Sequence, residues 1–141
     1  MHADRYEHFH EYRDITSAEA YHQEYEKKSE EAEKWKYGNS HGLARVLIFK
    51  LFYLRESGSV RNIQDTDTYR ECERRLAEVM KFREQRFDGE TADDENDRVR
   101  RLGNTFVERA LLFLIVDDHD SAERMLTRAM DIACKMPSNI R

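Results

Sequence analysis

The sequence contains few residues that break helices. A single proline, Pro137, and five glycines occur in 141 residues, while Ala, Leu, Glu, Lys and Arg, all strong helix formers, are abundant. An all-β fold needs many turns and strand-forming residues, so this composition argues against one. We therefore expect an all-α protein with a single domain over residues 1–141. It should contain about five antiparallel helices, arranged as an irregular helical bundle or as stacked helical hairpins.

Cysteine is also scarce. Cys72 and Cys134 lie far apart in the chain, and neither belongs to a CxxC motif or a Cys/His cluster. This spacing argues against a disulfide framework and against a zinc site. Both cysteines fall on apolar faces of predicted helices, so we predict two reduced, packed thiols and no cofactor.

Long apolar runs and an excess of one charge are absent as well. The stretches LIFKLFYL and ALLFLIV are far shorter than the roughly 20 residues that span a bilayer. The segment MHADRYEHFH does not have the pattern of a secretory signal, which predicts a cytoplasmic protein without a membrane span. Charged residues make up 38% of the chain but leave a net charge of only −5, which disfavours nucleic acid as a partner.

Local signals predict the first helices. Residues 1–15 are expected to form a flexible or helical N-terminal arm. Thr16 and Glu19 have the form of a capping box, and Gly38 is a natural residue after a helix end. These signals predict a long helix over residues 17–37, followed by a turn at GNSHG.

The rest of the chain is divided by Gly58 and by two polar loops. Further helices are predicted over 41–56, 67–87, from about 92 or 97 to 117, and 120–136. The 67–87 helix should bury Tyr69, Cys72, Leu76, Val79, Met80 and Phe87. The last helix should turn Ala122, Met125, Leu126, Ala129, Met130, Ala133 and Met136 inward, with Asp120 or Ser121 as its N-cap.

One glycine falls inside a predicted helix. Gly103 costs about 1 kcal/mol there relative to alanine. Either a neighbouring helix passes close to it or the helix is locally weakened.

The last two predicted helices, residues 99–137, resemble a tetratricopeptide-repeat hairpin. The resemblance is carried by a group in each helix: Leu102, Gly103, Asn104 and Phe106 in the first, and Ala122, Ala129 and Pro137 in and after the second. The step from Leu102 to Ala122 is longer than in that family. The resemblance implies protein or peptide binding in a concave groove, and no catalysis.

Aromatic residues give the candidate binding surface. Tyr21, Tyr25, Trp35 and Tyr37 lie on an otherwise charged segment, and such large side chains need to be buried by something. Packing within the chain is one interpretation. The other is an anchor patch for a protein partner or for a second copy in a homodimer.

The sequence has few patterns typical of catalytic or metal-binding sites. G-x-S-x-G, the P-loop and G-x-G-x-x-G are all missing from the sequence. Glu19 and His22 form an ExxH pair of the kind used in helical di-iron proteins, but a second such pair is lacking. His119, in the turn DDHD, could lie in a cation site or in a pair of helix caps, and capping is favoured.

Basic clusters occur at residues 70–86 and 98–101. Arg70, Arg74, Lys81 and Arg98 could line a phosphate-binding stripe. Acidic residues alternate with them, so a salt-bridged, solvated face is the preferred interpretation.

These observations favour a non-enzymatic protein–protein interaction module, a small helical adaptor or regulatory subunit. The first alternative is a small inhibitor of the mobile-element or phage type that occludes a macromolecular target. The second is a helical metal-binding protein built around Glu19 and His22.

Overall fold

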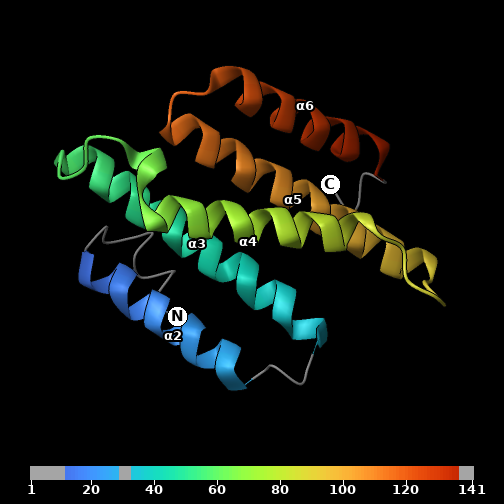
Figure 1. Ribbon diagram of the computed structural model, residues 1–141. Helices are drawn as coiled ribbons and strands as arrows, with labels where there is room; N and C mark the ends of the chain where they lie inside the picture. Colours follow the sequence, from blue (N-terminus) through green and yellow to red (C-terminus); the bar gives the residue numbers. More distant parts are fainter. Residues whose placement is uncertain (1–11, 29–32, 137–141) are drawn as a thin grey trace. The chain divides into compact units, whose positions relative to one another are not determined.

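The computed structural model of the protein describes residues 12–28 and 33–136 (Figure 1). This part of the chain forms five α-helices and one short 3₁₀ helix and contains no strand. The elements are α2 (Tyr12–Lys28), α3 (Glu33–Ser57), η1 (Ile63–Asp65), α4 (Asp67–Glu84), α5 (Ala92–Ile115) and α6 (His119–Lys135). The predicted all-α class is confirmed. None of these helices is both long and apolar enough to cross a membrane.

The chain divides into two compact units, Met1–Leu76 and Ala77–Arg141. The boundary lies within α4, so α2, α3, η1 and the first part of α4 belong to the first unit. The rest of α4, with α5 and α6, belongs to the second. The expected single domain over residues 1–141 stays a prediction.

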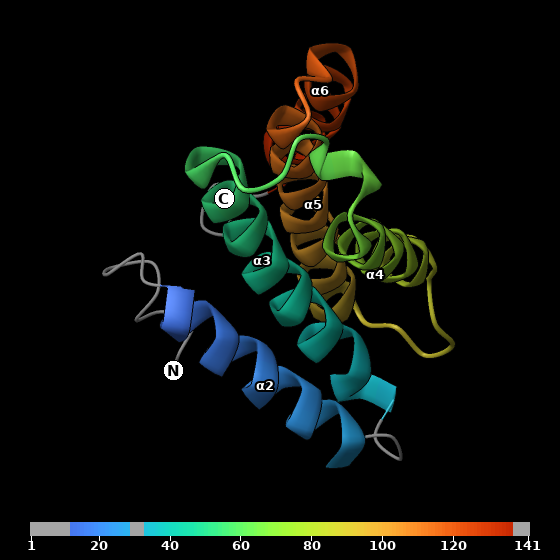
Figure 2. The same cartoon turned by 60° about the vertical axis from the view of Figure 1, so that its left-hand side comes forward.

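In the first unit α2 and α3 lie side by side (Figures 1 and 2). Ile15 and Ala18 of α2, three residues apart, pack with Val46 of α3 in a buried cluster. At the edge of this contact Lys50 Nζ lies 3.1 Å from Glu19 Oε2, with both side chains about one-fifth exposed. Apolar burial therefore joins the two helices, and an ion pair borders the contact.

The predicted helix over 17–37 is wrong at both ends. Thr16 and Glu19 lie inside α2, and Gly38 and Gly42 lie inside α3. Two helical glycines cost about 1 kcal/mol each, but α3 buries a large apolar row over the same length: Leu43, Val46, Leu47, Ile48 and Leu51. Burial of that row outweighs the local signal to stop the helix.

The other end of α3 follows the prediction. Gly58 adopts a φ of +68°, a left-handed conformation that favours glycine, directly after the last helical residue. The next helix, α4, begins where Thr66 Oγ1 accepts a hydrogen bond from the backbone N–H of Tyr69 at 3.1 Å. Cys72 is fully buried and its Sγ donates to the carbonyl oxygen of Ala44 at 3.4 Å, which confirms a packed thiol at this position.

Phe87 does not belong to the buried row of α4. The helix ends at Glu84, and Phe87 is 54% exposed in the loop that contains Gly89, whose φ is +80°. Tyr69, Leu76 and Val79 are buried as predicted.

In the second unit α5 and α6 form an antiparallel hairpin (Figures 1 and 2). A capping box begins α5, because Thr91 Oγ1 accepts from the Asp94 N–H and Asp94 Oδ2 accepts from the Thr91 N–H, both at 3.1 Å. This confirms the earlier of the two predicted starts.

The predicted cap of α6 is wrong. Asp118, and not Asp120 or Ser121, caps the helix, because its carboxylate accepts from the Ser121 N–H at 3.2 Å. The hydrogen bonds with Ser121 lower the pKa of the Asp118 carboxyl. The chain reaches this cap through Asp117, whose φ is 59°. The capping interpretation of the DDHD turn is therefore supported.

Gly103 lies where α6 crosses α5. A Cβ added to this glycine would meet Ile132 Cγ2 at 3.5 Å, an ordinary van der Waals distance. A neighbouring helix does pass close to Gly103, but it leaves room for a methyl group.

Candidate functional site

The predicted aromatic patch is only partly within the described residues. Tyr21 of α2 is 45% exposed, and Tyr37 of α3 is half-buried with Lys36 Nζ 5.6 Å from its ring centroid. The side chains of Tyr25 and Trp35 lie outside the described part of the chain. The prediction of a four-residue aromatic anchor therefore stays a prediction.

Hydrogen bonds between polar side chains join α2 and α3 next to Tyr21. Asn39 Nδ2 donates to the carbonyl oxygen of His22 at 3.0 Å, so its Oδ1 faces the His22 ring, 2.8 Å from Nδ1. Nδ1 therefore carries the proton and donates to Asn39. The ring lies directly over Gly42, where an added Cβ would come within 2.7 Å of His22 Cε1. This arrangement makes His22 a packed structural residue.

The two residues of the predicted ExxH pair, Glu19 and His22, therefore each bind a different residue of α3. Glu19 binds Lys50 and His22 binds Asn39. Within the described residues no group of three or more His, Cys, Asp or Glu side chains could hold a metal ion.

The side chain of Arg75, on α4, hydrogen-bonds to residues of α2 and α3. It is 8% exposed, and its guanidinium donates to Glu26 at 2.6 and 3.2 Å, to Glu71 at 2.7 Å and to Ser40 Oγ at 3.2 Å. The hydrogen bonds from Arg75 hold the pKa of Glu26 below its ordinary value. A buried guanidinium with these acceptors is satisfied, and this cluster joins three helices of the first unit.

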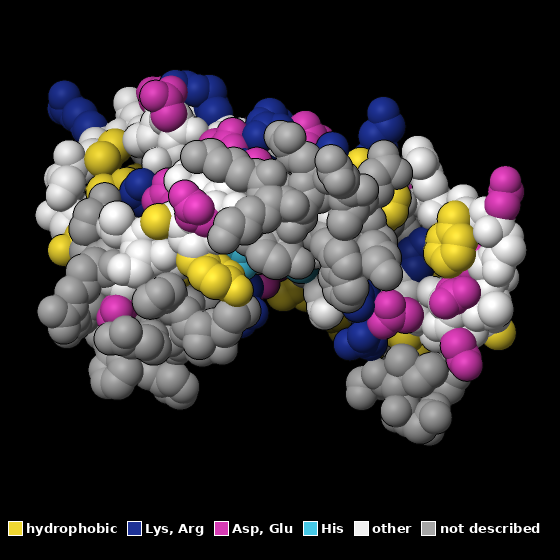
Figure 3. All heavy atoms as spheres, turned by 90° about the horizontal axis from the view of Figure 1, so that it is seen from below, with side chains coloured by type: hydrophobic (Ala, Val, Ile, Leu, Met, Phe, Trp, Pro, Cys, Tyr) yellow, Lys and Arg dark blue, Asp and Glu magenta, His cyan; other side chains and the backbone are white. Residues whose placement is uncertain are grey.

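The basic clusters pair with neighbouring acids. Arg70 lies 2.5 Å from Asp67, Arg74 2.9 Å from Glu71 and Arg98 2.7 Å from Glu90. On the face drawn in Figure 3, basic and acidic side chains lie among one another and form no field of a single sign. These pairs favour the interpretation of a salt-bridged surface at these positions and disfavour a phosphate-binding stripe.

The clearest anomaly of the surface is on α6, which is apolar along two rows. The first row, Ala122, Met125, Ala129, Ile132 and Met136, is buried or half-buried. The second row, Leu126, Met130 and Ala133, is exposed, with Leu126 at 40% and Met130 at 65%. The prediction that both rows face inward is wrong for the second one, because α5 covers only one side of α6.

Contacts within the second unit show which side stays open. Thr105 and Arg109 of α5, and Arg128 of α6, contact Arg83, Met80 and Glu84 of α4. At 100° per residue, Val107 and the second row of α6 fall on the opposite side of the hairpin. Contacts between Phe106 and Arg128, and between Gly103 and Ile132, set Val107 level with residues 126–130.

Val107 is 40% exposed. We call Val107, Leu126, Met130 and Ala133 the outer apolar face. It runs across both helices of the hairpin and has the composition of a contact surface.

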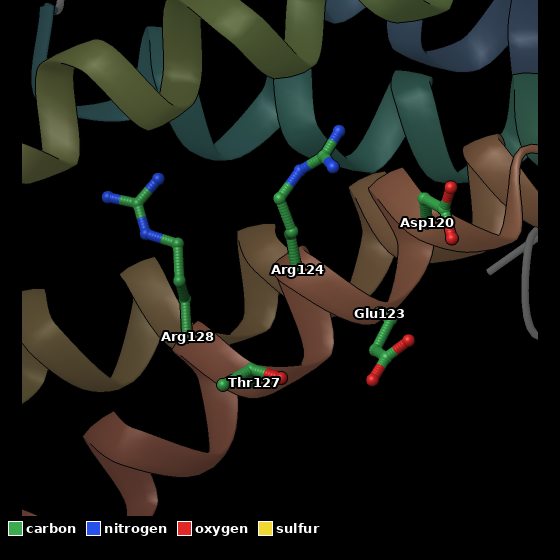
Figure 4. A pocket seen from close by; sticks show the side chains of 5 residues that line it. All are labelled: Asp120, Glu123, Arg124, Thr127 and Arg128. Atoms are coloured by element: carbon green, nitrogen blue, oxygen red, sulfur yellow. The ribbon is translucent and has the colours of Figure 1, made fainter.

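A hollow of about 480 Å³ lies along the polar side of α6. Its wall is formed by Asp120, Glu123, Arg124, Thr127 and Arg128. Figure 4 shows that Arg124 and Arg128 extend from α6 in the same direction, while Glu123 points away from them. The hollow therefore presents two guanidinium groups together.

Cys134 is exposed near the end of α6, so the prediction of a packed thiol is wrong there. It lies on the polar side of α6, in line with the exposed Glu123 and Thr127 and away from the row that packs on α5.

No protein-family model, curated protein or solved structure matches the chain. The resemblance of residues 99–137 to a tetratricopeptide hairpin stays a prediction.

The outer apolar face was missed because the sequence pattern reports which residues are apolar, and not what covers them. A usable signal was present. The apolar residues of α6 span two adjacent heptad-like rows, which is more than one neighbouring helix buries.

Proposed function

We propose that the protein is a non-enzymatic protein–protein interaction module, a small helical adaptor or regulatory subunit. It binds an amphipathic helix of a partner protein on the outer apolar face. The observation that carries the proposal is that α6 is apolar on two sides, while the described residues of the chain cover only one of them.

The geometry of the hairpin favours a helical partner. Two antiparallel helices with a common open side form a shallow groove, and a third helix fits such a groove with side chains at i, i+3, i+4 and i+7. Val107 from α5 and Leu126 and Met130 from α6 line this side. Methionine adapts its shape to different partners, which suits Met130 at the most exposed position.

The free energy of burying these side chains also favours binding of a partner. Full burial of a large aliphatic side chain contributes about 1.5–3 kcal/mol. Val107, Leu126 and Met130 retain 40%, 40% and 65% exposure, so a partner helix gains a useful part of that energy from each. In protein interfaces a few buried side chains commonly carry most of the binding energy.

Site-specific photo-crosslinking in the cells of origin tests the proposal. A crosslinking amino acid replaces Met130, and in a matched chain it replaces Phe82, which lies on α4 and is 44% exposed. We expect a covalent adduct with another polypeptide from position 130 and none from position 82. Additional Leu126→Asp substitution should abolish the adduct.

Recovery of only the uncrosslinked chain from position 130 would contradict the proposal. Equal adducts from positions 130 and 82 would also contradict it, because they would show nonspecific contact. An adduct with a second copy of the chain would identify a homodimer that forms through this face. The outer apolar face would then still be an interface, but the partner would be another copy of the chain.

A further inference from the structure

Three arginines of the second unit differ from their neighbours. Arg86, Arg98, Arg100 and Arg101 each have a carboxylate oxygen at 2.5–2.9 Å. Within the described residues, no carboxylate lies within hydrogen-bonding distance of Arg109, Arg124 or Arg128. These three guanidinium groups are candidates for an external anion.

Arg109 is the most deeply placed of the three. Its Nε is buried without a hydrogen-bond partner, and its Nη1 donates to Met80 Sδ at 3.4 Å, a weak acceptor. The group also lies 5.6 Å from the Phe113 ring centroid. A buried charged donor without an acceptor is costly, and a bound anion is one of the ordinary explanations.

Arg128 is held in place by an aromatic ring. Its Cζ lies 4.4 Å from the Phe106 ring centroid, and the nearest carboxylate oxygen given by its ion pair, Glu84 Oε1, is 3.7 Å away. The ring orients the guanidinium while its N–H groups remain available at the edge. Arg124 donates to Ser121 Oγ at 2.9 Å, which uses one of its five donors.

The hairpin brings the three groups to one side. Arg109 lies one turn after Phe106 on α5, and Arg124 lies one turn before Arg128 on α6. Because the helices are antiparallel, both steps run in the same direction. On α4, Met80 lies one turn before Glu84, and these two residues contact Arg109 and Arg128 in the same order. Arg109 therefore lies at the level of Arg124 along the hairpin, one turn from the level of Phe106 and Arg128.

The hollow along α6 gives an anion room to reach Arg124 and Arg128. Arg124 and Arg128 stand on its wall and extend the same way (Figure 4). Asp120 and Glu123 also line it, with Glu123 directed away from the arginines. Glu84, at 3.7 Å from Arg128, is the carboxylate that an anion would have to compete with.

We propose that Arg109, Arg124 and Arg128 form a binding site for a phosphate group. Three guanidinium groups offer more donors than a single carboxylate accepts, whereas a phosphate dianion has several strong acceptor oxygens. The site is on the α4 side of the hairpin, opposite the outer apolar face. Phosphate and partner helix therefore occupy separate surfaces.

Inorganic phosphate is the first probe. The full chain is titrated with sodium phosphate at constant ionic strength, adjusted with sodium chloride, and binding is followed by calorimetry and by the shift of the unfolding midpoint. We expect saturable binding of one phosphate per chain. Acetate, a carboxylate, should bind at least about tenfold more weakly because it offers fewer acceptors.

Four variants identify the site. Arg124→Gln and Arg109→Gln should weaken phosphate binding at least about tenfold, since each removes a charge-assisted hydrogen bond. Arg100→Gln, whose parent residue is paired with Asp97 and 48% exposed in its side chain, should leave binding within about twofold. Glu84→Gln should tighten it, because the competing carboxylate is removed; a general ionic-strength effect would not do this.

The proposal is overturned if phosphate stabilises the chain no more than chloride does, or if Arg100→Gln weakens binding as much as Arg124→Gln. If Arg109→Gln does not fold, the exposed Arg124→Gln and Glu84→Gln variants decide the outcome. A phosphoserine peptide serves as a second probe. Tighter binding of the peptide than of inorganic phosphate assigns the natural phosphate to a modified protein, and equal or weaker binding assigns it to a small phosphorylated compound.

Discussion

At the scale of single residues, the two glycines of α3 have different roles. Gly42 provides the space in which the His22 imidazole lies, whereas nothing lies within 4 Å of a Cβ added to Gly38. Since both are helical, their effects on helix propensity are similar. The difference between them therefore isolates the contact with His22.

Alanine substitution at the two positions should change stability in opposite directions. Gly38→Ala should raise the free energy of unfolding by up to about 1 kcal/mol through helix propensity. Gly42→Ala should lower it by about 1–3 kcal/mol, because the new methyl overlaps the His22 ring. Urea unfolding of both variants measures this, and a stabilised Gly42→Ala protein would refute the packing of His22 described above.

Thr105 is a second residue whose effect can be isolated. Its fully buried hydroxyl accepts from Arg83 Nη1 at 2.8 Å and donates to the Arg101 carbonyl oxygen at 2.9 Å. Burial lowers the pKa of the Arg83 guanidinium to about 10, so loss of an acceptor at this position is costly. Thr105→Val keeps the shape and should lower the free energy of unfolding by about 1–3 kcal/mol. The exposed Thr127→Val is the control and should change it by less than about 0.5 kcal/mol; equal effects would rule out the buried hydrogen bond as the cause.

At the scale of elements, α6 has one structural side and one open side. Ile132 packs over Gly103, whereas Met130 is 65% exposed two residues earlier. Ile132→Ala should lower the free energy of unfolding by about 1–3 kcal/mol. Met130→Ala should change it by less than about 0.5 kcal/mol. Thermal or urea unfolding compares the two, and a large loss with Met130→Ala would mean that the outer apolar face is already buried in the free protein.

The helices α2 and α4 of the first unit are linked by a pair that depends on pH. Hydrogen bonds from Arg75 lower the pKa of Glu26 below its ordinary value of 4.5. Because this pKa is lower in the folded state, the stabilisation is present above pH 4.5 and is lost as pH falls through the lowered pKa.

Glu26→Gln should therefore be less stable than the natural chain at pH 7, and the difference should shrink as pH falls below 4.5. Urea unfolding across pH 3–7 (roughly the range in which carboxyl groups titrate) measures it. The control is Glu24→Gln, on the exposed side of α2. A difference that stays constant over this range would show that the Glu26 charge does not contribute to the link.

At the scale of the whole molecule, opposite charges neutralise each other locally. Many of the described ion pairs join residues three or four positions apart, such as Arg100 and Arg101 with Asp97. Exposed pairs of this kind contribute little each and are screened by salt, while salt also relieves repulsion from the net charge of −5. Raising sodium chloride about tenfold should therefore change the free energy of unfolding in urea by less than about 1 kcal/mol. A loss of several kcal/mol would show that exposed ion pairs hold the fold together.

The sequence predicted features that depend on neighbouring residues better than features that depend on residues far apart in the chain. Some helix ends that depend on neighbouring residues were predicted: α5 begins at the earlier of two expected starts, and Gly58 follows α3. Others were wrong, because Thr16 lies inside α2 and Asp118 caps α6. Gly38 was misleading because its effect on the helix is smaller than the burial along α3. The contact of Asn39 with His22, 17 positions apart, has no local signature.

The composition and periodicity of this sequence by themselves determined that the chain is all-α. Helix propensity and capping act within a few residues, so they can be read without a fold. Only the tertiary structure decided which apolar row of α6 is covered, where His22 and Arg75 find their partners, and which arginines are left beside the hollow. Those outcomes depend on which helix lies next to which, because burial and pairing are properties of contacts between segments far apart in the chain.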